Sequence, residues 1–383
     1  MSEWNKVKLE EILQVKKGEY ITKKEAKEGI YPVILGGKEP AYYINKFNHT
    51  GKAIVISRSG ASAGYVSFWN EPIFVTDGFL IEPKDNVNFE FLYYILKSKQ
   101  RELHNTQKGA AIPHVTPALI GSIDGLLPDI LIQQNIVSIL SRYDTLIENY
   151  QKQIKLLEEA AQRLYKEWFV DLRFPGHENT KIVDGVPEDW EKKTINDICT
   201  HISSGSTPSR RNKSYWENGT IKWIKTKELL DGWIFDTEEY ITDDGLKNSS
   251  TKIYPVNSIL MAIYASPTLG RLGILASECC CNQAALCLIA NEQIVSWQWL
   301  YWKLFELRDE FNSIARGAGQ QNISGIVVKN KEVLVPTRQV IDAFTNIANP
   351  IFQKIKKTSY QIHLLTEARD RLLPKLMSGE ITV

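Results

Sequence analysis

The sequence predicts an α+β protein in pseudo-two-fold tandem repeat, with two mixed α/β domains separated by two long antiparallel coiled-coil helices. Three observations predict this class. Residues 153–164 return at 361–372 with eight identities in twelve positions. Each half of the chain has short apolar runs between glycine-rich turns, which is typical of strands. Each half then ends in a long stripe of helical periodicity. One structural unit is therefore used twice.

The repeat also sets the expected domain organisation. A shift of 208 residues aligns Pro128 with Pro336, whereas Trp4 and Trp190, which mark the starts of the two halves, differ by 186. The second half therefore carries about twenty extra residues, nearly all in its N-terminal part. The expected segments are a first domain at 1–127, a helix at 128–173, a linker at 174–189, a second domain at 190–335 and a second helix at 336–383.

Each domain is expected to place strands before a shorter helix. In the first domain, β-branched runs predict strands at 53–57 and 74–76, and a helix follows at 89–105. In the second domain, the equivalent strands are expected at 258–262 and 284–289, with a helix at 296–314. We therefore expect the two domains to share the order of their strands and helix and to differ in the loops between these elements.

The two long helices are predicted by narrow apolar stripes at three- and four-residue steps, which are typical of a coiled-coil seam. The first stripe runs from Ile139 to Trp168, and the second runs from Ile347 to Leu376, with Thr358 and Arg369 as polar interruptions. Pro350 is expected to kink the second helix or delay its start, because it lacks a backbone donor. An alternative is that each helix packs only on its own domain.

Antiparallel pairing of these helices has geometric consequences. The two domains would lie at opposite ends of the pair, and the chain termini would come close together. Helices of this length span roughly 50–60 Å, whereas one turn of DNA is about 34 Å. Such an arrangement suits a DNA target of two parts with an unread spacer between them.

Composition narrows the class of protein. The chain has 383 residues with 43% apolar content, enough for two or three domains with proper cores. Its net charge is +1, so any contact with nucleic acid must use local basic surfaces. Five cysteines in no disulfide pattern favour a reducing compartment. Without a long apolar run or a secretory signal, we expect a cytoplasmic protein that does not enter membranes.

Several motifs, in order, resemble those of one family. Residues 167–177 read Glu-Trp-Phe-Val-Asp-Leu-Arg-Phe-Pro-Gly-His and are followed by Pro187 and Trp190. The second half adds Gly-Ser-Thr-Pro-Ser at 205–209 and Gly-x-Gly-Gln-x-Asn-Ile-Ser at 317–324. Over essentially the whole chain, these motifs resemble the specificity subunits of type I restriction–modification systems.

The resemblance implies a role and a set of partners. Such subunits carry two target recognition domains, each of which reads half of a bipartite double-stranded DNA target. Their helices dock two methyltransferase subunits, which use S-adenosylmethionine, and motor–nuclease subunits, which use ATP and Mg, complete the restricting complex. By this resemblance the chain itself has no catalytic residues, metal or cofactor.

Loops that combine basic side chains, hydroxyls and glycine are the candidate DNA contacts, because they approach phosphates and base edges closely. The candidates in the first domain are Ser57, Arg58, Ser59, Ser62, Lys108 and His114. Those in the second domain are Ser206, Thr207, Ser209, Arg210, Arg211, Lys213, Lys225, Lys227, Arg271, Arg316, Gln320, Gln321 and Asn322. Each of them could instead belong to an ordinary solvated loop.

Tyr165, Trp168 and Phe169 are candidates for docking a methyltransferase subunit, although they could equally pack under the adjoining linker. Two other functions stay open at this point. One is a stand-alone nuclease that uses Asp184 and Glu191. The other is a coiled-coil scaffold that binds proteins and not DNA.

Overall fold

A computed structural model describes residues 4–22, 25–105, 114–264, 268–317 and 322–383. The chain divides into two compact units. Unit 1 comprises Met1–Glu148 and Leu364–Val383, and unit 2 comprises Asn149–His363. Each unit therefore holds one α/β domain together with part of each long helix. The division cuts through both helices and does not set them apart from the domains.

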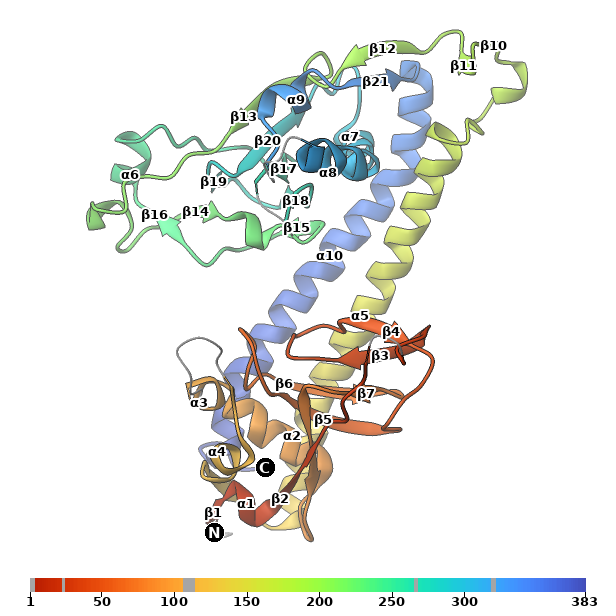
Figure 1. Cartoon of the computed structure of the whole chain (residues 1–383). Helices are drawn as coiled ribbons and strands as arrows, with labels where there is room; N and C mark the ends of the chain where they lie inside the picture. Colours follow the sequence, from red (N-terminus) through yellow and green to blue (C-terminus); the bar gives the residue numbers. More distant parts are fainter. Residues whose placement is uncertain (1–3, 23–24, 106–113, 265–267, 318–321) are drawn as a thin grey trace. The chain divides into compact units, whose positions relative to one another are not determined.

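In the residues that the structure describes, the domain of unit 1 is built from nine short strands and four short helices (Figure 1). Its elements in chain order are β1 (Asn5–Lys8), α1 (Leu9–Ile12), β2 (Leu13–Lys17), β3 (Glu28–Ile34), β4 (Tyr42–Ile44), β5 (Lys52–Ser57), β6 (Val66–Asn70), β7 (Phe74–Val75), β8 (Gly78–Pro83), α2 (Phe89–Ser98), α3 (Gln100–Asn105), α4 (Pro117–Gly121) and β9 (Asp124–Leu127). The strands form an antiparallel sheet β2-β8-β5-β6, a sheet β4-β3-β7 in which β3 and β7 are parallel, and the pair β1-β9.

The domain of unit 2 repeats this plan. Its elements are β12 (Glu191–Thr194), β13 (Cys199–Ser204), β14 (Ile221–Ile224), β15 (Gly232–Ile234), β16 (Tyr240–Ile241), α6 (Asp243–Lys247), β17 (Ile259–Ala262), β18 (Leu272–Leu275), β19 (Cys280–Cys281), β20 (Ala285–Ala290), α7 (Trp297–Glu306), α8 (Arg308–Gly317), α9 (Gly325–Lys329) and β21 (Glu332–Val335), with 3-10 turns at Lys213–Tyr215 and Thr226–Glu228. A linker precedes it, with a 3-10 turn at His177–Asn179 and the hairpin β10 (Ile182–Val183) and β11 (Val186–Pro187).

The sheets of the two units correspond strand by strand. The order β13-β20-β17-β18 matches β2-β8-β5-β6, β16-β14-β19 matches β4-β3-β7, and β12-β21 matches β1-β9. The parallel pair within each three-stranded sheet is also reproduced. The added elements β15 and α6 both fall between β14 and β17, where the sequence predicts the extra residues. The repeat is therefore a repeat of the fold.

Each domain packs a helix against its main sheet. In unit 1, Phe91, Leu92 and Ile95 of α2 are buried against the sheet residues Ile54 and Phe79. In unit 2, Trp299 and Leu300 of α7 are buried in the corresponding core. Burial of large aromatic side chains dominates such cores. The sequence predicts one shorter helix in each domain, at 89–105 and at 296–314. The structure divides each of them in two: α2 and α3 in unit 1, and α7 and α8 in unit 2.

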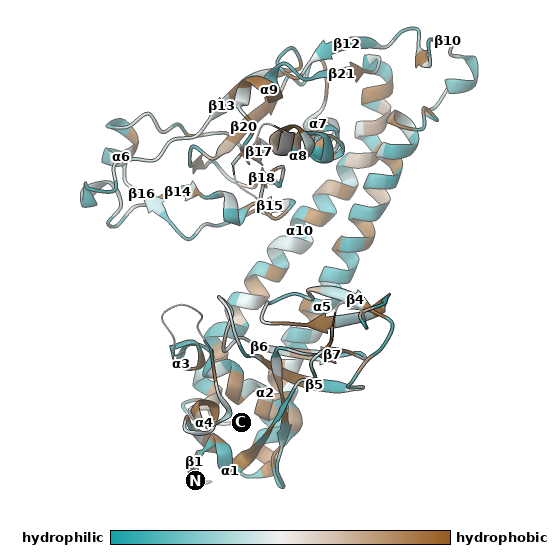
Figure 2. Ribbon diagram, viewed as in Figure 1, coloured by the Kyte–Doolittle hydropathy of each residue, from teal (hydrophilic) through white to brown (hydrophobic). Residues whose placement is uncertain are grey.

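The two long helices are α5 (Ile130–Phe169) and α10 (Arg338–Met377). Within unit 2, Tyr165 near the end of α5 contacts Phe344 near the start of α10, with ring centroids 6.2 Å apart. Within unit 1, Arg369 near the end of α10 bonds Asp144 near the start of α5 at 2.6 Å. The predicted antiparallel pairing is confirmed in both places. Figure 2 shows apolar and polar residues alternating along both helices, as a one-sided stripe requires.

Both helices pack on both domains. Ile136 and Leu140 of α5 and Leu376 of α10 join the core of unit 1, whereas the end of α5 joins the core of unit 2. The alternative in which each helix packs only on its own domain is therefore wrong. The expectation that Pro350 delays the second helix is also wrong, because α10 begins at Arg338 and continues through Pro350.

The chain ends meet within unit 1, as the antiparallel arrangement predicts. A methyl group added at Gly379 would lie 3.0 Å from the indole of Trp4, so the two terminal segments are in contact. A buried side chain fixes the start of α5: the Gln133 amide accepts from the Asn88 backbone N–H at 2.8 Å and donates to the Pro128 carbonyl at 2.9 Å. Among the described helices, none combines the length and apolar character needed to cross a bilayer.

Candidate DNA interface

The structure brings the two candidate segments of the first domain together. The loop after β5 is tied to the segment after α3, because the Val115 N–H donates to the Arg58 carbonyl at 2.9 Å and Ser59 forms a β-bridge with His114. Gly64, at φ +82°, closes the loop by donating to the Ser57 carbonyl at 2.8 Å. Only glycine adopts this conformation without strain.

The same junction recurs in unit 2. The Ile323 N–H donates to the Ile263 carbonyl at 2.8 Å, and Tyr264 forms a β-bridge with Asn322. Gly270, at φ +78°, takes the place of Gly64. Both units therefore present a strand-end loop and a helix-end segment as one continuous surface. This pairing lies beyond local sequence patterns, because it joins segments about 55–60 residues apart in each half.

The side chains at the junction in unit 1 differ in their exposure and in their hydrogen-bond partners. Arg58 is 53% exposed and lies 3.9 Å from the Asp77 carboxylate, which also accepts a hydrogen bond from Ser59. His114 is exposed. Ser57 is only 2% exposed and donates to the Gly37 carbonyl at 3.2 Å. The prediction that Ser57 contacts DNA is wrong, because its buried hydroxyl stabilises the loop from inside the domain.

A cavity of about 820 Å³ adjoins this loop within unit 1. Ser62 lines it together with Tyr65 and three cations, Lys38, Lys97 and Arg101. The ammonium groups of Lys38 and Lys97 lie 5.5 and 4.9 Å from the centroid of the Tyr65 ring. Burial lowers the pKa of Lys97, and the nearby Arg369 lowers it further. These cations were not predicted from the sequence, where Lys97 within the largely apolar helix α2 was the available signal.

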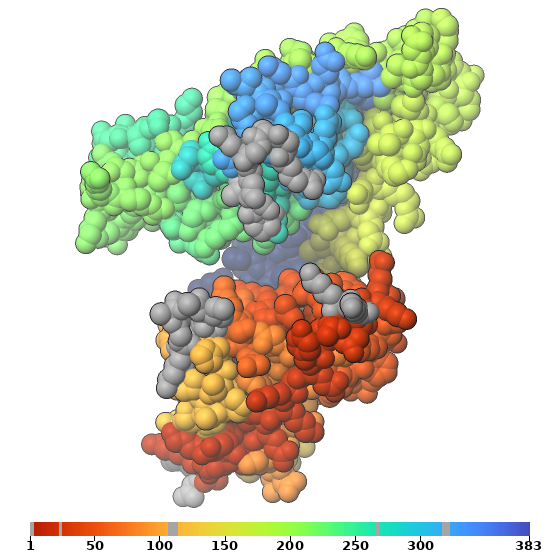
Figure 3. Space-filling view, in the orientation of Figure 1, coloured from red at the N-terminus to blue at the C-terminus, as the bar shows by residue number. Residues whose placement is uncertain are grey.

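In unit 2, the segment after β13 holds several candidate residues at a projecting extension formed by β14, β16 and α6, which Figure 3 shows in green. Ser206 bonds the Ser250 hydroxyl at 2.7 Å, Thr207 bonds Gln283, and Ser209 is exposed. The Arg210 guanidinium stacks 3.5 Å from the centre of the Trp216 ring and pairs with Glu239. Arg210 therefore holds this extension together.

Two acidic residues, Glu238 and Glu239, also engage Lys225 and Lys227. Lys225 lies 3.3 Å from Glu238 and also pairs with Glu239, and Lys227 lies 2.5 Å from Glu238. The hydrogen bond that Lys225 donates to Glu239 raises the pKa of Lys225; burial opposes this rise, and the hydrogen bond donated to Glu238 adds to it. Burial raises the pKa of Glu239, but hydrogen bonds from Lys225 and Arg210 outweigh it, and the net shift is downward. The positive charges of Arg210, Lys225 and Lys227 are therefore balanced by the neighbouring carboxylates of Glu238 and Glu239.

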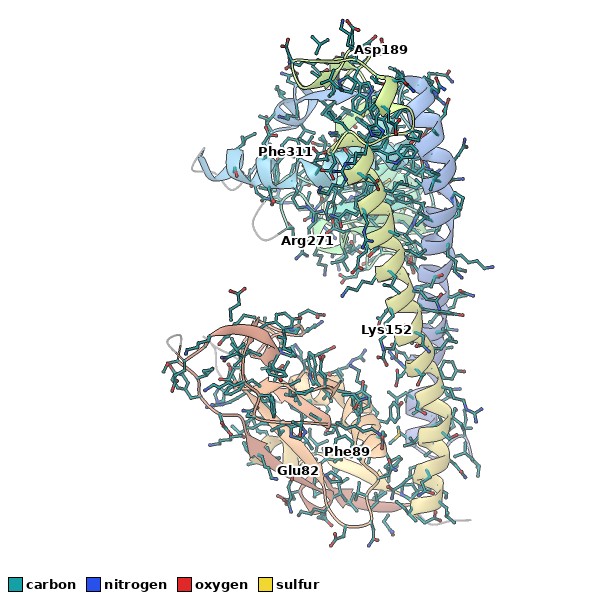
Figure 4. The ribbon with its side chains drawn as sticks, turned by 90° about the vertical axis from the view of Figure 1, so that its right-hand side faces the viewer. Glu82, Phe89, Lys152, Asp189, Arg271 and Phe311 are labelled. Atoms are coloured by element: carbon teal, nitrogen blue, oxygen red, sulfur yellow. The ribbon has the colours of Figure 1, made fainter. Side chains whose placement is uncertain are left out.

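Two other cations of this extension, Arg211 and Lys213, are exposed and form no ion pair within the described ranges. Arg271, labelled in Figure 4, is half-buried directly before β18. Asn322 is exposed beside Tyr264. Lys108, Gln320 and Gln321 lie outside the described residues, as does the side chain of Arg316. Of the basic candidates in unit 2 whose side chains the structure describes, Arg211, Lys213 and Arg271 form no ion pair and keep their charges open to a ligand.

The docking assignment for Tyr165, Trp168 and Phe169 is wrong. Their exposed fractions are 3%, 7% and 6%, because they pack into the aromatic core of unit 2. Phe169 lies 6.1 Å from Trp190, which in turn packs on Phe174 of the linker. The alternative, packing under the linker, is the one the structure adopts.

The residues proposed for nuclease chemistry do not share a site. Asp184, at φ +52°, and Gly185 form the turn of the β10–β11 hairpin, and Glu191 pairs with Lys193. The described part of the chain has no group of three histidine, cysteine or acidic residues arranged to hold a metal ion. All five cysteines are free thiols, and Cys281 and Cys287 are fully buried. The nuclease interpretation therefore loses its structural support.

Two copies of one α+β fold, each with its own loop junction, define a duplicated recognition protein. The family model of the type I restriction modification DNA specificity domain matches residues 1–159 and 187–365. The chain therefore belongs to this family of type I restriction–modification specificity subunits, and it is a DNA-recognition subunit and not an enzyme.

Individual relatives agree with this placement. The MjaIX specificity subunit of Methanocaldococcus jannaschii is 29% identical, over 87% of this chain and 78% of its own. The MjaVIII specificity subunit of the same organism is 25% identical, over 100% of this chain and 93% of its own. The crystal structure of the type I S subunit from M. genitalium matches with a TM-score of 0.61 at 20% identity, covering 98% of this chain and 96% of that one. The last match shows the shared fold.

Proposed function

We propose that the chain reads a bipartite DNA target, with the domain of each unit recognising one part. One observation carries this proposal. The two domains share every sheet and the same loop junction, yet the side chains at the two junctions differ: Arg58, Ser59 and His114 in unit 1 correspond to Ile263, Tyr264 and Asn322 in unit 2. Equal scaffolds with unequal contact residues suit the reading of two different short sequences.

Within this function, the candidate residues have different roles: some contact DNA, and others stabilise the loops that carry those contacts. Arg58 and Arg211 are placed to meet phosphates or guanine edges, and Asn322 has the amide that pairs with adenine. Arg210, Lys225 and Lys227 support the extension that carries Arg211. Because the net charge is only +1, we infer that phosphate contacts are few and local.

The wider assembly is also part of the proposal. The chain docks two methyltransferase subunits and, through them, motor–nuclease subunits, and it works in the cytoplasm, where the DNA is. S-adenosylmethionine belongs to the methyltransferase, and ATP with Mg belongs to the motor–nuclease. The residues of this chain then choose the sequence and hold no cofactor.

A binding selection tests this function. The chain is assembled with the methyltransferase subunit of its own system, and bound duplexes are selected from random DNA and sequenced. The expected motif has two specified parts separated by a spacer of fixed length and free sequence. A single uninterrupted motif would contradict the two-part reading, and no sequence preference at all would favour the protein-binding scaffold.

A further inference from the structure

One cavity of unit 2 lies outside the loops assigned to DNA. Its volume is about 320 Å³, at the lower end of the roughly 300–1,000 Å³ that is typical of small-molecule sites. Residues of α5, β15, α7 and α10 line it. All of these residues belong to unit 2, so the cavity is complete within one compact unit.

The walls of this cavity are largely aromatic. Trp302 of α7 packs against Phe305, with ring centroids 5.4 Å apart, and against Phe352 of α10, with centroids 6.3 Å apart. On β15, Trp233 adds a further ring, and the ammonium group of Lys356 lies 4.4 Å from its centroid. Aromatic faces attract cations because their π-electrons carry partial negative charge. The Trp233 ring already attracts one cation in this way.

A carboxyl group without a partner lines the same cavity. Glu158 of α5 is half-buried, and among the described residues it forms no hydrogen bond or ion pair. Burial, followed by the nearby Asp231, raises its pKa. The other charged residues of the lining are Lys155 and Glu159, which are exposed, and Asp231, which already pairs with Arg308. A positive charge brought beside Glu158 would therefore stabilise its ionised form.

Two indole groups of the lining also lack a hydrogen-bond acceptor. The Nε1 atoms of Trp233 and Trp302 are buried, and neither donates to any group in the part of the chain that the structure describes. Trp302 as a whole is only 5% exposed. A buried donor without an acceptor is unfavourable. A ligand that carries an oxygen acceptor would satisfy such a donor.

The chemistry of this cavity belongs to unit 2 and not to the shared fold. Trp233 comes with β15, one of the elements added between β14 and β17. By the 208-residue shift, Glu158 corresponds to Thr366, and Phe305 corresponds to Lys97. The carboxyl group and the ring are therefore replaced in unit 1. An acidic cavity also does not suit DNA, because phosphates require cations.

We propose that this cavity of unit 2 binds a small organic cation, an alkylammonium ion that also carries an oxygen acceptor. The ammonium group lies against the Glu158 carboxylate and the rings of Trp302 and Phe305, and the oxygen accepts a hydrogen bond from an indole N–H. Because the lining comes from α5, α7, α10 and β15, the ligand links both long helices to the domain of unit 2. Binding therefore stabilises this unit, and it does not depend on DNA.

Choline is the probe, because it joins a trimethylammonium group to a hydroxyl. The full-length chain is titrated with choline at pH 8 by isothermal titration calorimetry, and thermal unfolding is followed in parallel. One choline should bind per chain and raise the unfolding temperature. The neutral carbon analogue, in which a tert-butyl group replaces the trimethylammonium group, keeps the shape and loses the charge. It should bind at least about tenfold more weakly.

Variants locate the binding site. Glu158→Gln removes the charge but keeps the shape of the side chain, and it should weaken choline binding about tenfold. Phe305→Leu keeps an apolar side chain but loses the ring, and it should weaken binding about threefold. Glu167→Gln is the matched control, because Glu167 is exposed on the same helix and lies outside the cavity lining. It should leave choline affinity unchanged.

Thermal unfolding without choline shows that each variant still folds cooperatively. A wild-type chain that does not bind choline would overturn the proposal, and so would equal affinities for choline and its carbon analogue. Unchanged choline affinity in Glu158→Gln would mean that the cation binds elsewhere, which would overturn the assignment of this cavity.

Discussion

Arg369 on α10 donates to Asp144 on α5 at 2.6 Å, which joins two residues 225 positions apart. Asp144 also accepts from the Tyr94 hydroxyl of α2 at 2.6 Å. Burial, followed by the Asp144 hydrogen bond, raises the pKa of Tyr94, which stays protonated as a donor. The polar interruption that Arg369 makes in the apolar stripe is therefore a specific link between both long helices and the domain of unit 1.

This link predicts a measurable coupling. Arg369→Ala and Asp144→Ala should each lower the free energy of unfolding by about 1–2 kcal/mol, because the pair is largely but not fully withdrawn from water. The double variant should cost less than the sum of the two, and urea denaturation of the four proteins measures the difference. Additive costs would mean that the two residues act independently.

The core position of Phe169 makes a second prediction. Phe169→Ala should lower the stability of unit 2 by about 3–5 kcal/mol, since it leaves a cavity among aromatic rings. Val170→Ala, at an exposed neighbour, is the control and should change stability little. If Phe169→Ala left the unfolding transition unchanged but abolished methyltransferase binding, a docking role for this residue would be restored.

Neighbouring arginines in unit 2 should behave differently. Arg210→Ala removes the stacking on Trp216 and should cost about 1–2 kcal/mol of stability. Arg211→Ala should leave stability unchanged but weaken DNA binding and reduce the slope of log affinity against log salt by about one. Fluorescence anisotropy over a salt series, with thermal unfolding in parallel, separates the two. Equal salt slopes for Arg211→Ala and wild type would exclude a phosphate contact.

The carboxyl of Glu158 predicts a dependence of stability on pH. Burial, and then the nearby Asp231, raises its pKa from 4.5 to about 7. Between these values the folded chain keeps a proton that the unfolded chain releases, so this residue costs stability as pH rises through the window. Glu158→Gln should therefore stabilise the protein at pH 8, by about 1 kcal/mol after allowance for solvent screening, and give no gain at pH 4. An equal effect at both pH values would contradict this, and Glu159→Gln is the exposed control.

The sequence predicts the periodic and repeated features of the fold well. The 208-residue shift correctly indicates two equivalent domains and antiparallel helices, because a seam of regular spacing has few ways to pack. The extra residues are found where the shift changes, between β14 and β17. Pro350 was expected to delay the start of the second helix, but the helix continues through it. Tertiary packing outweighs this local preference, because Phe344 and Phe352 on either side of Pro350 are buried in the core.

The candidate site was predicted less well, because burial and ion pairing depend on the tertiary structure. Ser57 and Arg58 are adjacent in sequence, yet one is inside and the other outside. Arg210, Lys225 and Lys227 read as open cations until Glu238 and Glu239, more than ten residues later, are folded against them. The aromatic residues at the end of α5 suggested a partner surface, but they fill the core of unit 2.

The central claim is that each domain reads its own part of the target, and methylome sequencing tests it most directly. Cells carry the methyltransferase subunit with either the wild-type chain or Arg58→Ala, and modified adenines are mapped. The wild-type motif should have two specified parts, and Arg58→Ala should relax one part while the other keeps its sequence. Relaxation of both parts to the same extent would contradict the account.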